Sequence, residues 1–260
     1  MSEYPESILR VEYQSDRQVA VLTLDAPPLN VVTIQTREHF AATFRQIEDN
    51  PAVRVVIVRG AGNEALSSGG DIAGFLKATP EYLTHLAYNV AAPERCSKPV
   101  IARIAGYALG VGLEIALACD FRLASETAQL GLPEMRLGMI PGSGGTQRIA
   151  RMAGLGRAMD MILRARRISA TEAKEWGLLT EVVPLSALDA RIDAFVDELL
   201  ALSPLAFKMG KRALHAAMET PLSAGLALEG GLYGFLRTTE DFQEGVQAFK
   251  EKRRPQFKGK

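Results

Sequence analysis

The sequence predicts an α/β fold in its first part and a purely helical C-terminal part. In the first part, short β-branched or apolar runs are followed several times by a glycine turn and a segment with helical spacing. After Gly145 the strand-like runs become rare, and residues 185–249 carry helical spacing almost throughout. A succession of strands and helices is typical of α/β folds. We therefore expect an α/β core in residues 1–184 and a helical region in residues 185–260.

Length and composition bound the class of protein. A chain of 260 residues with 47% hydrophobic and 23% charged residues is typical of one large globular domain, or of one domain with an appendage. The 30 basic residues balance the 30 acidic ones, so nothing favours a nucleic-acid partner. Glycine or charged residues interrupt the apolar runs well short of a membrane span, so no membrane partner is expected either.

The N-terminal sequence and the cysteines indicate the compartment. No apolar leader segment stands in MSEYPESILR. Cys96 and Cys119 are too few for a disulfide scaffold and lack a CxxC spacing. We therefore expect a reduced, cytoplasmic protein.

Alternating or β-branched runs predict the strands of the core, the first two of them around a turn at Ser15-Asp16. The run VRVVIVR before Gly60 has the continuous apolar character of a strand that is buried on both faces. The expected strands are 8–13, 18–24, 53–59, 99–104 and 120–124, with a brief extended piece at 182–184.

Helical spacing and capping residues predict the helices. Residues 33–48 place Phe40, Phe44 and Ile47 on one face, and Thr33 is a suitable N-cap. Further helices are expected from about residue 71 and at 80–95, 110–118, 146–152, 156–164 and 171–176. Four more are expected between 185 and 249, separated at Ser203-Pro204, Thr220-Pro221 and Thr238-Thr239.

Two glutamates in the glycine-rich stretch 106–145 form the candidate site. Glu114 lies in an apolar run that opens at Gly110-Val111-Gly112, and Glu134 precedes the loop of residues 141–145. A carboxylate in an apolar helix is costly unless it has a partner or a function. Two structural interpretations stay open at this point: a hydrogen-bonded Glu114, and a glycine turn that only packs a helix against a strand. The dinucleotide fingerprint is excluded, because Ile115 occupies the position of its third glycine.

Other catalytic motifs are weak. Ser143 lacks the G-x-S-x-G elbow of a serine nucleophile. His39, His85 and His215 have no metal-ligand spacing, so we expect no metal site. A GxxxxGK[ST] phosphate loop is also missing.

Several spaced motifs, in order, resemble the enoyl-CoA hydratase/isomerase (crotonase) family along nearly the whole chain. They are SSGGDI at 67–72, KPVIARIAGYALGVGLEIALACD at 98–120, LPEMRLGMIPGSGGTQR at 132–148 and ISATEAKEWGL at 168–178. The resemblance implies a spiral of repeated ββα turns and a helical C-terminal region that forms a homotrimer or a dimer of trimers. It also implies acyl-CoA thioesters as substrates, with CoA as part of the substrate and no separate cofactor.

The resemblance also implies roles for individual residues. The backbone N–H groups of Gly70 and Val111 would form an oxyanion hole for the thioester carbonyl, which gains negative charge during the reaction. Many relatives have glycine in place of Val111, and valine keeps the N–H while narrowing the pocket. Glu114 would activate water, and Glu134 would deliver a proton to Cα. Further substrate contacts are expected at Ser68, Gly69, Asp71, Ile72, Gly110, Pro133 and Gly142.

Three functions follow from this resemblance. The first is a hydratase that adds water to a 2-enoyl-CoA, or removes it in reverse. The second is an enoyl-CoA isomerase or another crotonase-type lyase or hydrolase, for which Glu134 alone could move the proton. The third is a non-catalytic acyl-CoA-binding or assembly protein, which the presence of both acids and both glycine loops disfavours.

Overall fold

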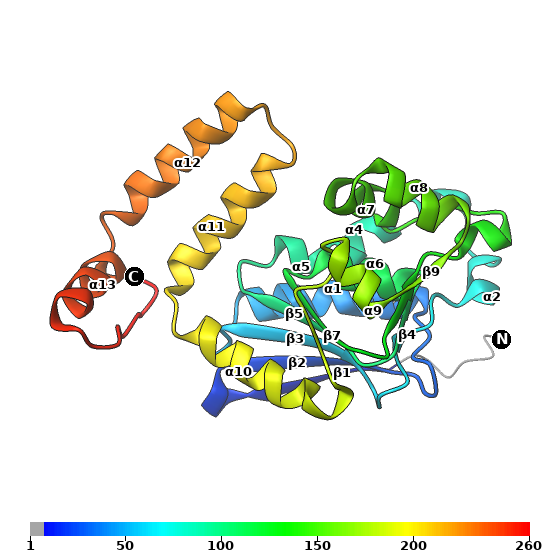
Figure 1. Cartoon of the computed structure of the whole chain (residues 1–260), viewed down its shortest axis with the longest axis horizontal. Helices are drawn as coiled ribbons and strands as arrows, with labels where there is room; N and C mark the ends of the chain where they lie inside the picture. The colour runs from blue at the N-terminus through cyan, green and yellow to red at the C-terminus, as the bar shows by residue number, and fades with distance from the viewer. Residues whose placement is uncertain (1–7) are drawn as a thin grey trace. The chain divides into compact units, whose positions relative to one another are not determined.

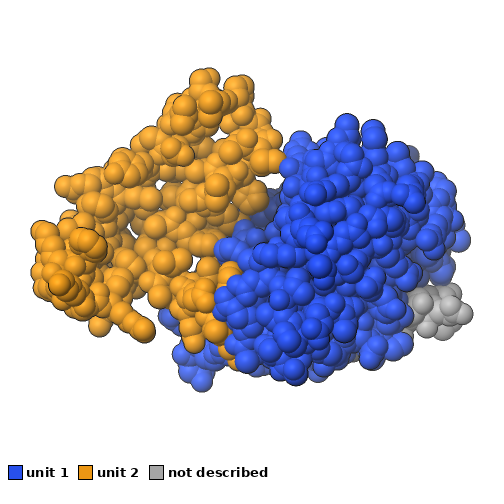
Figure 2. All heavy atoms as spheres, in the orientation of Figure 1, with its two compact units in different colours: residues 1–96, 100–192 blue, residues 97–99, 193–260 orange. Residues whose placement is uncertain are grey.

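A computed structural model of the protein describes residues 8–260. The first seven residues, and with them most of the N-terminal segment in which we expected no leader, lie outside the described residues. The chain divides into two compact units, which Figure 2 colours separately. One unit comprises residues 1–96 and 100–192, and the other comprises residues 97–99 and 193–260.

The first unit contains a six-stranded sheet with the strand order β1-β2-β3-β5-β7-β10. Strands β1 and β2 form an antiparallel hairpin, and the remaining neighbours are parallel. All the strands predicted from sequence belong to this sheet. Their bounds are β1 Ile8–Gln14, β2 Val19–Asp25, β3 Val55–Gly60, β5 Val100–Ile104, β7 Phe121–Ser125 and β10 Glu181–Val183.

A second sheet of four short strands has the order β4-β6-β8-β9. Its strands are β4 Ala65–Ser67, β6 Tyr107–Leu109, β8 Gln129–Gly131 and β9 Arg167–Ser169. The first three run parallel, and β9 is antiparallel to β8. None of these four strands was predicted from the sequence, because a run of three residues is too short to display the period of a strand.

From β3 to β8, successive strands of the chain alternate between the two sheets. Each of the pairs β3–β4, β5–β6 and β7–β8 sends its first strand to the larger sheet and its second strand to the smaller one. Helices follow each pair, so the unit repeats as strand, strand, helix. This arrangement is the predicted spiral of ββα turns.

The helices of the first unit begin with α1 (Ile34–Glu48), whose cap residue Thr33 accepts the backbone N–H of Thr36. The predicted single helix at 80–95 is wrong. It is three short helices, and Pro93 stands in the first turn of the last of them, where a residue without an N–H is tolerated. The other helices are α2 Ile72–Phe75, α3 Pro80–Leu83, α4 Leu86–Val90, α5 Ala92–Arg95, α6 Val111–Ala118, α7 Gly145–Ala153, α8 Leu155–Leu163 and α9 Ala170–Glu175.

Helix α6 is the central helix of the first unit (Figure 1). All eight of its residues are buried, and it packs against α4, α5 and α7 and beside β4 and β6. Leu113 and Ile115 of this helix belong to the same buried cluster as residues of both sheets. A polar side chain on α6 is therefore held inside the core, at a position that the surrounding packing determines.

The C-terminal region consists of helices, separated where the sequence predicted breaks. Ser203 caps α11 by accepting the N–H of Ala206, and Thr239 caps α13 by accepting the N–H of Phe242. The bounds are α10 Leu188–Leu200, α11 Pro204–Ala217, α12 Leu222–Leu236 and α13 Glu240–Glu251. Within residues 8–260, no helix has the length and apolar character that crossing a membrane requires.

Candidate active site

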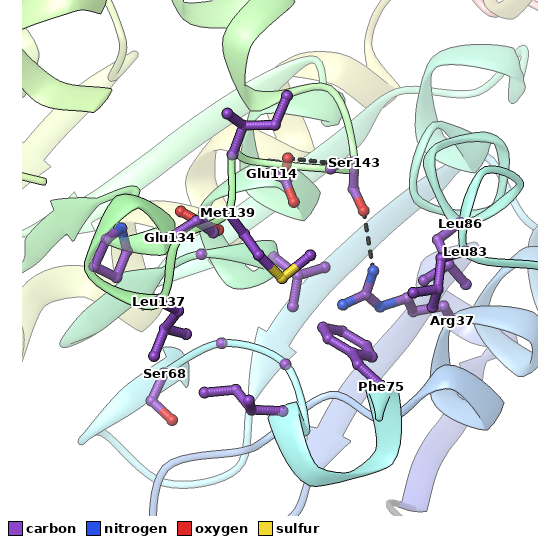
Figure 3. A pocket seen from close by; sticks show the side chains of 18 residues that line it. Arg37, Ser68, Phe75, Leu83, Leu86, Glu114, Glu134, Leu137, Met139 and Ser143 are labelled. Atoms are coloured by element: carbon purple, nitrogen blue, oxygen red, sulfur yellow. Dashed lines mark hydrogen bonds between the residues drawn. The ribbon is translucent and has the colours of Figure 1, made fainter. Parts of the chain in front are cut away.

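A cavity of about 170 Å³ lies at the N-terminus of α6 in the first unit (Figure 3). The turn before α6 and the helix itself contribute one side of its lining. The loop after β4, the short 3-10 helix Glu134–Leu137 with Pro133 before it, the loop that precedes α7 and residues from α1 to α4 contribute the rest. Ten of the predicted site residues line it: Ser68, Gly69, Gly70, Ile72, Gly110, Val111, Glu114, Pro133, Glu134 and Gly142.

Asp71 is the one predicted site residue that does not line the cavity. It occupies the N-cap position of α2 and is buried, with 3% of its surface exposed.

Two backbone N–H groups at the cavity are available to a ligand. Val111 is the first residue of α6, and the first N–H groups of a helix have no acceptor within it. Gly70 forms an isolated β-bridge with Val32. The hydrogen bonds of this bridge join Val32 to backbone groups of the two residues that flank Gly70, so the bridge does not use the N–H of Gly70. Neither the N–H of Gly70 nor that of Val111 donates a hydrogen bond to another described residue. Each of the two N–H groups is therefore left without an acceptor among the described residues at the cavity.

Gly110 permits the turn that opens α6. Its backbone has φ +52° and ψ −129°, a conformation that residues with a side chain rarely adopt. A Cβ at this position would lie 3.1 Å from Oε1 of Glu134 and 3.5 Å from the Cα of Gly69. Because Gly110 has no side chain, there is room beside it for the carboxylate of Glu134 and for the backbone of Gly69.

Glu114 is held by the loop that precedes α7. Only 2% of the residue is exposed, and its Oε1 accepts the backbone N–H groups of Ser143 at 2.7 Å and of Gly145 at 2.9 Å. Gly144, with φ +101°, turns the loop between these two donors. The other oxygen, Oε2, accepts no hydrogen bond from a described residue. The structural interpretation of Glu114 as a hydrogen-bonded side chain is therefore confirmed for one oxygen, while the second stays available at the cavity.

Glu134 has a different environment. Its Oε2 is buried and accepts no hydrogen bond from the described residues. Burial raises the pKa of Glu134 to about 7, and the charge of Glu114 acts in the same direction, against a backbone hydrogen bond and the positive charge of Arg37. A carboxyl group with a pKa near 7 is partly protonated at neutral pH, so Glu134 can donate a proton there.

Arg37 is a cavity residue that the sequence analysis missed. It extends from α1 into the pocket beside the ring of Phe75, and 5% of its surface is exposed (Figure 3). Its Nη1 donates a hydrogen bond to Oγ of Ser143 at 3.0 Å. Burial lowers the pKa of Arg37 to about 10, against the opposing effect of Glu114 and Glu134, so the guanidinium stays charged at neutral pH.

One sequence signal could have identified Arg37. It precedes Phe40 by three residues and Phe44 by seven, which places it on the buried face of α1. A charged residue on the apolar face of a helix needs a partner or a function.

Ser143 forms hydrogen bonds with both Glu114 and Arg37. Its backbone N–H binds Glu114, its Oγ accepts from Arg37, and its carbonyl oxygen accepts from Nη1 of Arg148 at 2.8 Å. Arg148 is itself fixed by two hydrogen bonds to Glu94, at 2.6 and 2.7 Å. The serine is thus a part of the site through its contacts. The described residues include no group of three or more His, Cys, Asp or Glu side chains that could hold a metal ion.

The chain is similar in sequence and in fold to known proteins. The model of the enoyl-CoA hydratase/isomerase family matches residues 14–260. A crystal structure of enoyl-CoA hydratase from Bacillus anthracis is 38% identical, with a TM-score of 0.89, covering 97% of this chain and 99% of that one. The short-chain-enoyl-CoA hydratase of Clostridium acetobutylicum is 34% identical over 248 residues, which are 93% of this chain and 94% of the relative. The crotonyl-CoA hydratase of Syntrophomonas wolfei is 33% identical over 94% of this chain and 96% of its own length. On sequence and fold together, the chain belongs to the enoyl-CoA hydratase/isomerase family.

Proposed function

We propose that the protein adds water across the 2,3 double bond of a 2-enoyl-CoA thioester, and removes it in the reverse direction. The observation that carries this proposal is the pair of glutamates at one cavity, one bound by two amides and the other with a raised pKa. The names of the relatives from Clostridium acetobutylicum and Syntrophomonas wolfei support the same reaction.

In the proposed reaction the thioester carbonyl accepts hydrogen bonds from the N–H groups of Gly70 and Val111. These two donors stabilise the negative charge that the oxygen gains when a nucleophile adds to Cβ. Oε2 of Glu114 takes a proton from water as the water oxygen bonds to Cβ. Glu134, in its neutral form, gives a proton to Cα. Exchange with solvent then returns each acid to its starting state.

The proposed chemistry needs no cofactor, since CoA enters as part of the substrate. Each step is a proton transfer or the addition of water, and electrons are neither gained nor lost in total. The two carboxylates and two amides named above supply every group that the reaction requires.

The proposal is tested by mixing the protein with a panel of 2-enoyl-CoA thioesters and following the absorbance of the conjugated double bond. Hydration removes the conjugation, so we expect the absorbance to fall. If instead a 3-enoyl-CoA gains conjugation and the 2-enoyl-CoA is unchanged, the protein is an isomerase. Binding of acyl-CoA without any change of absorbance would indicate a non-catalytic protein and would contradict the proposal.

We further propose that the protein assembles as a trimer or as a dimer of trimers. The support is the set of large apolar side chains that the C-terminal helices expose, among them Leu214, Leu222, Leu226, Tyr233 and Phe249. Apolar surface of this extent is typical of a protein–protein interface. Sedimentation should give a mass of three or six chains at micromolar concentration, and a stable monomer would contradict this assembly.

A further inference from the structure

The hydrogen-bonding capacity of Arg37 is largely unused in the described structure. A guanidinium has five N–H donors, and that of Arg37 makes one hydrogen bond to a described residue, Ser143. Its Nε is buried and has no partner among the described residues. Burying a charged group is costly unless hydrogen bonds or an opposite charge compensate it. The charges of Glu114 and Glu134 offset part of this cost, but most N–H donors of the guanidinium have no acceptor among the described residues.

The two glutamates of the cavity do not complete the bonding of Arg37. Glu114 receives its hydrogen bonds from the amides of Ser143 and Gly145, and Glu134 is bonded to no side chain of residues 8–260. In Figure 3 the guanidinium and the carboxylate of Glu134 lie on opposite sides of the pocket. Arg37 is the only basic residue among the described residues that line the cavity. The cavity thus has a positive charge that neither acid neutralises through a direct contact.

The surroundings of Arg37 indicate the shape of its ligand. The guanidinium lies 5.0 Å from the ring centroid of Phe75, and Leu83 and Leu86 line the same side of the pocket. An acyl chain would pack against these apolar groups, and a negatively charged end would meet the guanidinium. The planar fork of arginine suits a carboxylate, which can accept two hydrogen bonds from it.

We propose that Arg37 binds a carboxylate carried by the acyl group, so that the preferred substrate is a 2-enoyl-CoA whose acyl chain ends in a carboxylate. This inference rests on the proposed hydration reaction and names the substrate class of the same site. The hydrogen bond from Nη1 to Ser143 holds the guanidinium in place from one side and leaves Nη2, which is not buried, to the ligand.

The inference is tested first by binding to the unmodified protein, which requires no turnover. Pentanedioyl-CoA ends in a carboxylate, and 5-methylhexanoyl-CoA replaces its two oxygens by two methyl groups. Both are saturated at Cα and Cβ, so neither can be hydrated. Calorimetry should show that the carboxylate compound binds about ten- to a hundredfold more tightly, as expected for hydrogen bonds to a charged group. Equal affinity, or tighter binding of the methyl compound, would overturn the inference.

The second test compares hydration of the corresponding 2-enoyl compounds, pent-2-enedioyl-CoA and 5-methylhex-2-enoyl-CoA. The measured quantity is the ratio of their kcat/KM values, because a change that merely perturbs the site lowers both alike. Arg37→Gln keeps a donor for Ser143 and removes the charge, and it should lower this ratio about tenfold or more. Arg45→Gln makes the same change at an exposed position of α1 and should leave the ratio as in the wild type.

The outcomes separate this inference from the proposed function. If neither thioester is hydrated while the saturated carboxylate binds more tightly, the hydratase proposal fails and the role of Arg37 stands. If both are hydrated and Arg37→Gln lowers the two kcat/KM values equally, Arg37 is a positioning residue and the inference is overturned. Should Arg37→Gln not fold, the binding comparison on the wild type decides alone.

Discussion

The backbone N–H of Ser143 lies 2.7 Å from Oε1 of Glu114, although the two residues are 29 positions apart in the chain. A loop, rather than another side chain, therefore holds the carboxylate that we propose as the water-activating base. The two amides of the loop, Ser143 and Gly145, therefore fix the orientation of this carboxylate.

Replacing either glutamate by glutamine should remove most hydration activity. Glu114→Gln and Glu134→Gln keep size and polarity but abolish proton transfer at the changed position. General acid–base catalysis contributes about a hundred- to ten-thousandfold in rate, so each variant should lose about that much kcat. The double variant should lose much less than the product of the two losses, because the residues act together. Stopped-flow absorbance on a 2-enoyl-CoA measures all four proteins.

An isomerase mechanism makes a different forecast for the same variants. There Glu134→Gln alone should be inactive, while Glu114→Gln should still move a proton between Cα and Cγ of a 3-enoyl-CoA. Near-wild-type hydration by Glu114→Gln would show that this residue does not activate the water.

The pH dependence of hydration should follow the protonation of Glu134. The carboxyl must hold its proton in order to donate it, and its pKa is raised to about 7. Its protonated fraction falls as the pH rises through that value, so kcat/KM should decline above about pH 7. A pH series of kcat/KM on one 2-enoyl-CoA gives the midpoint. A profile that stays level from pH 6 to pH 9 would argue against Glu134 as the acid.

Removing the Ser143 hydroxyl should destabilise the fold. Ser143→Ala keeps the N–H that binds Glu114 but leaves Nη1 of the buried Arg37 without its acceptor. An unsatisfied buried polar group costs about 1–3 kcal/mol, so the free energy of unfolding in urea should fall by about that amount. Ser68→Ala is the matched control at the same cavity, since the Ser68 hydroxyl makes no hydrogen bond to a described residue. Equal stability of the two variants would mean that the Arg37–Ser143 bond contributes nothing.

A methyl group at Gly110 should disturb both the backbone and Glu134. Alanine is strained at the φ of +52° found there, which costs about 1–3 kcal/mol, and its Cβ would lie 3.1 Å from Oε1 of the acid. Gly110→Ala should therefore lower both the melting temperature and kcat. Gly156→Ala adds a methyl within α8, where nothing lies within 4 Å and φ is negative, and should resemble the wild type. Unfolding followed by circular dichroism and steady-state rates measures both effects, and a normal Gly110→Ala variant would contradict this account.

Much of the fold could be predicted from the sequence because its signals are local. The cap at Thr33, the β-branched run of β3 and the breaks before α11, α12 and α13 each depend on residues close together in the chain. The same holds for the two glutamates, since an acid in an apolar or glycine-rich run is visible in the run itself. The order of the motifs then indicated the family.

The strands of the smaller sheet and the surroundings of the acids required the tertiary structure. Three residues such as Ala65–Ser67 become a strand only because β6 lies beside them. Likewise, Arg37 reaches a serine 106 positions further along the chain, and the raised pKa of Glu134 arises from burial by distant segments. The sequence by itself determined which elements form and which acids are candidates. Only the folded structure decided the bonding and the protonation of those acids, because desolvation and hydrogen bonding depend on atoms that the fold brings together from distant parts of the chain.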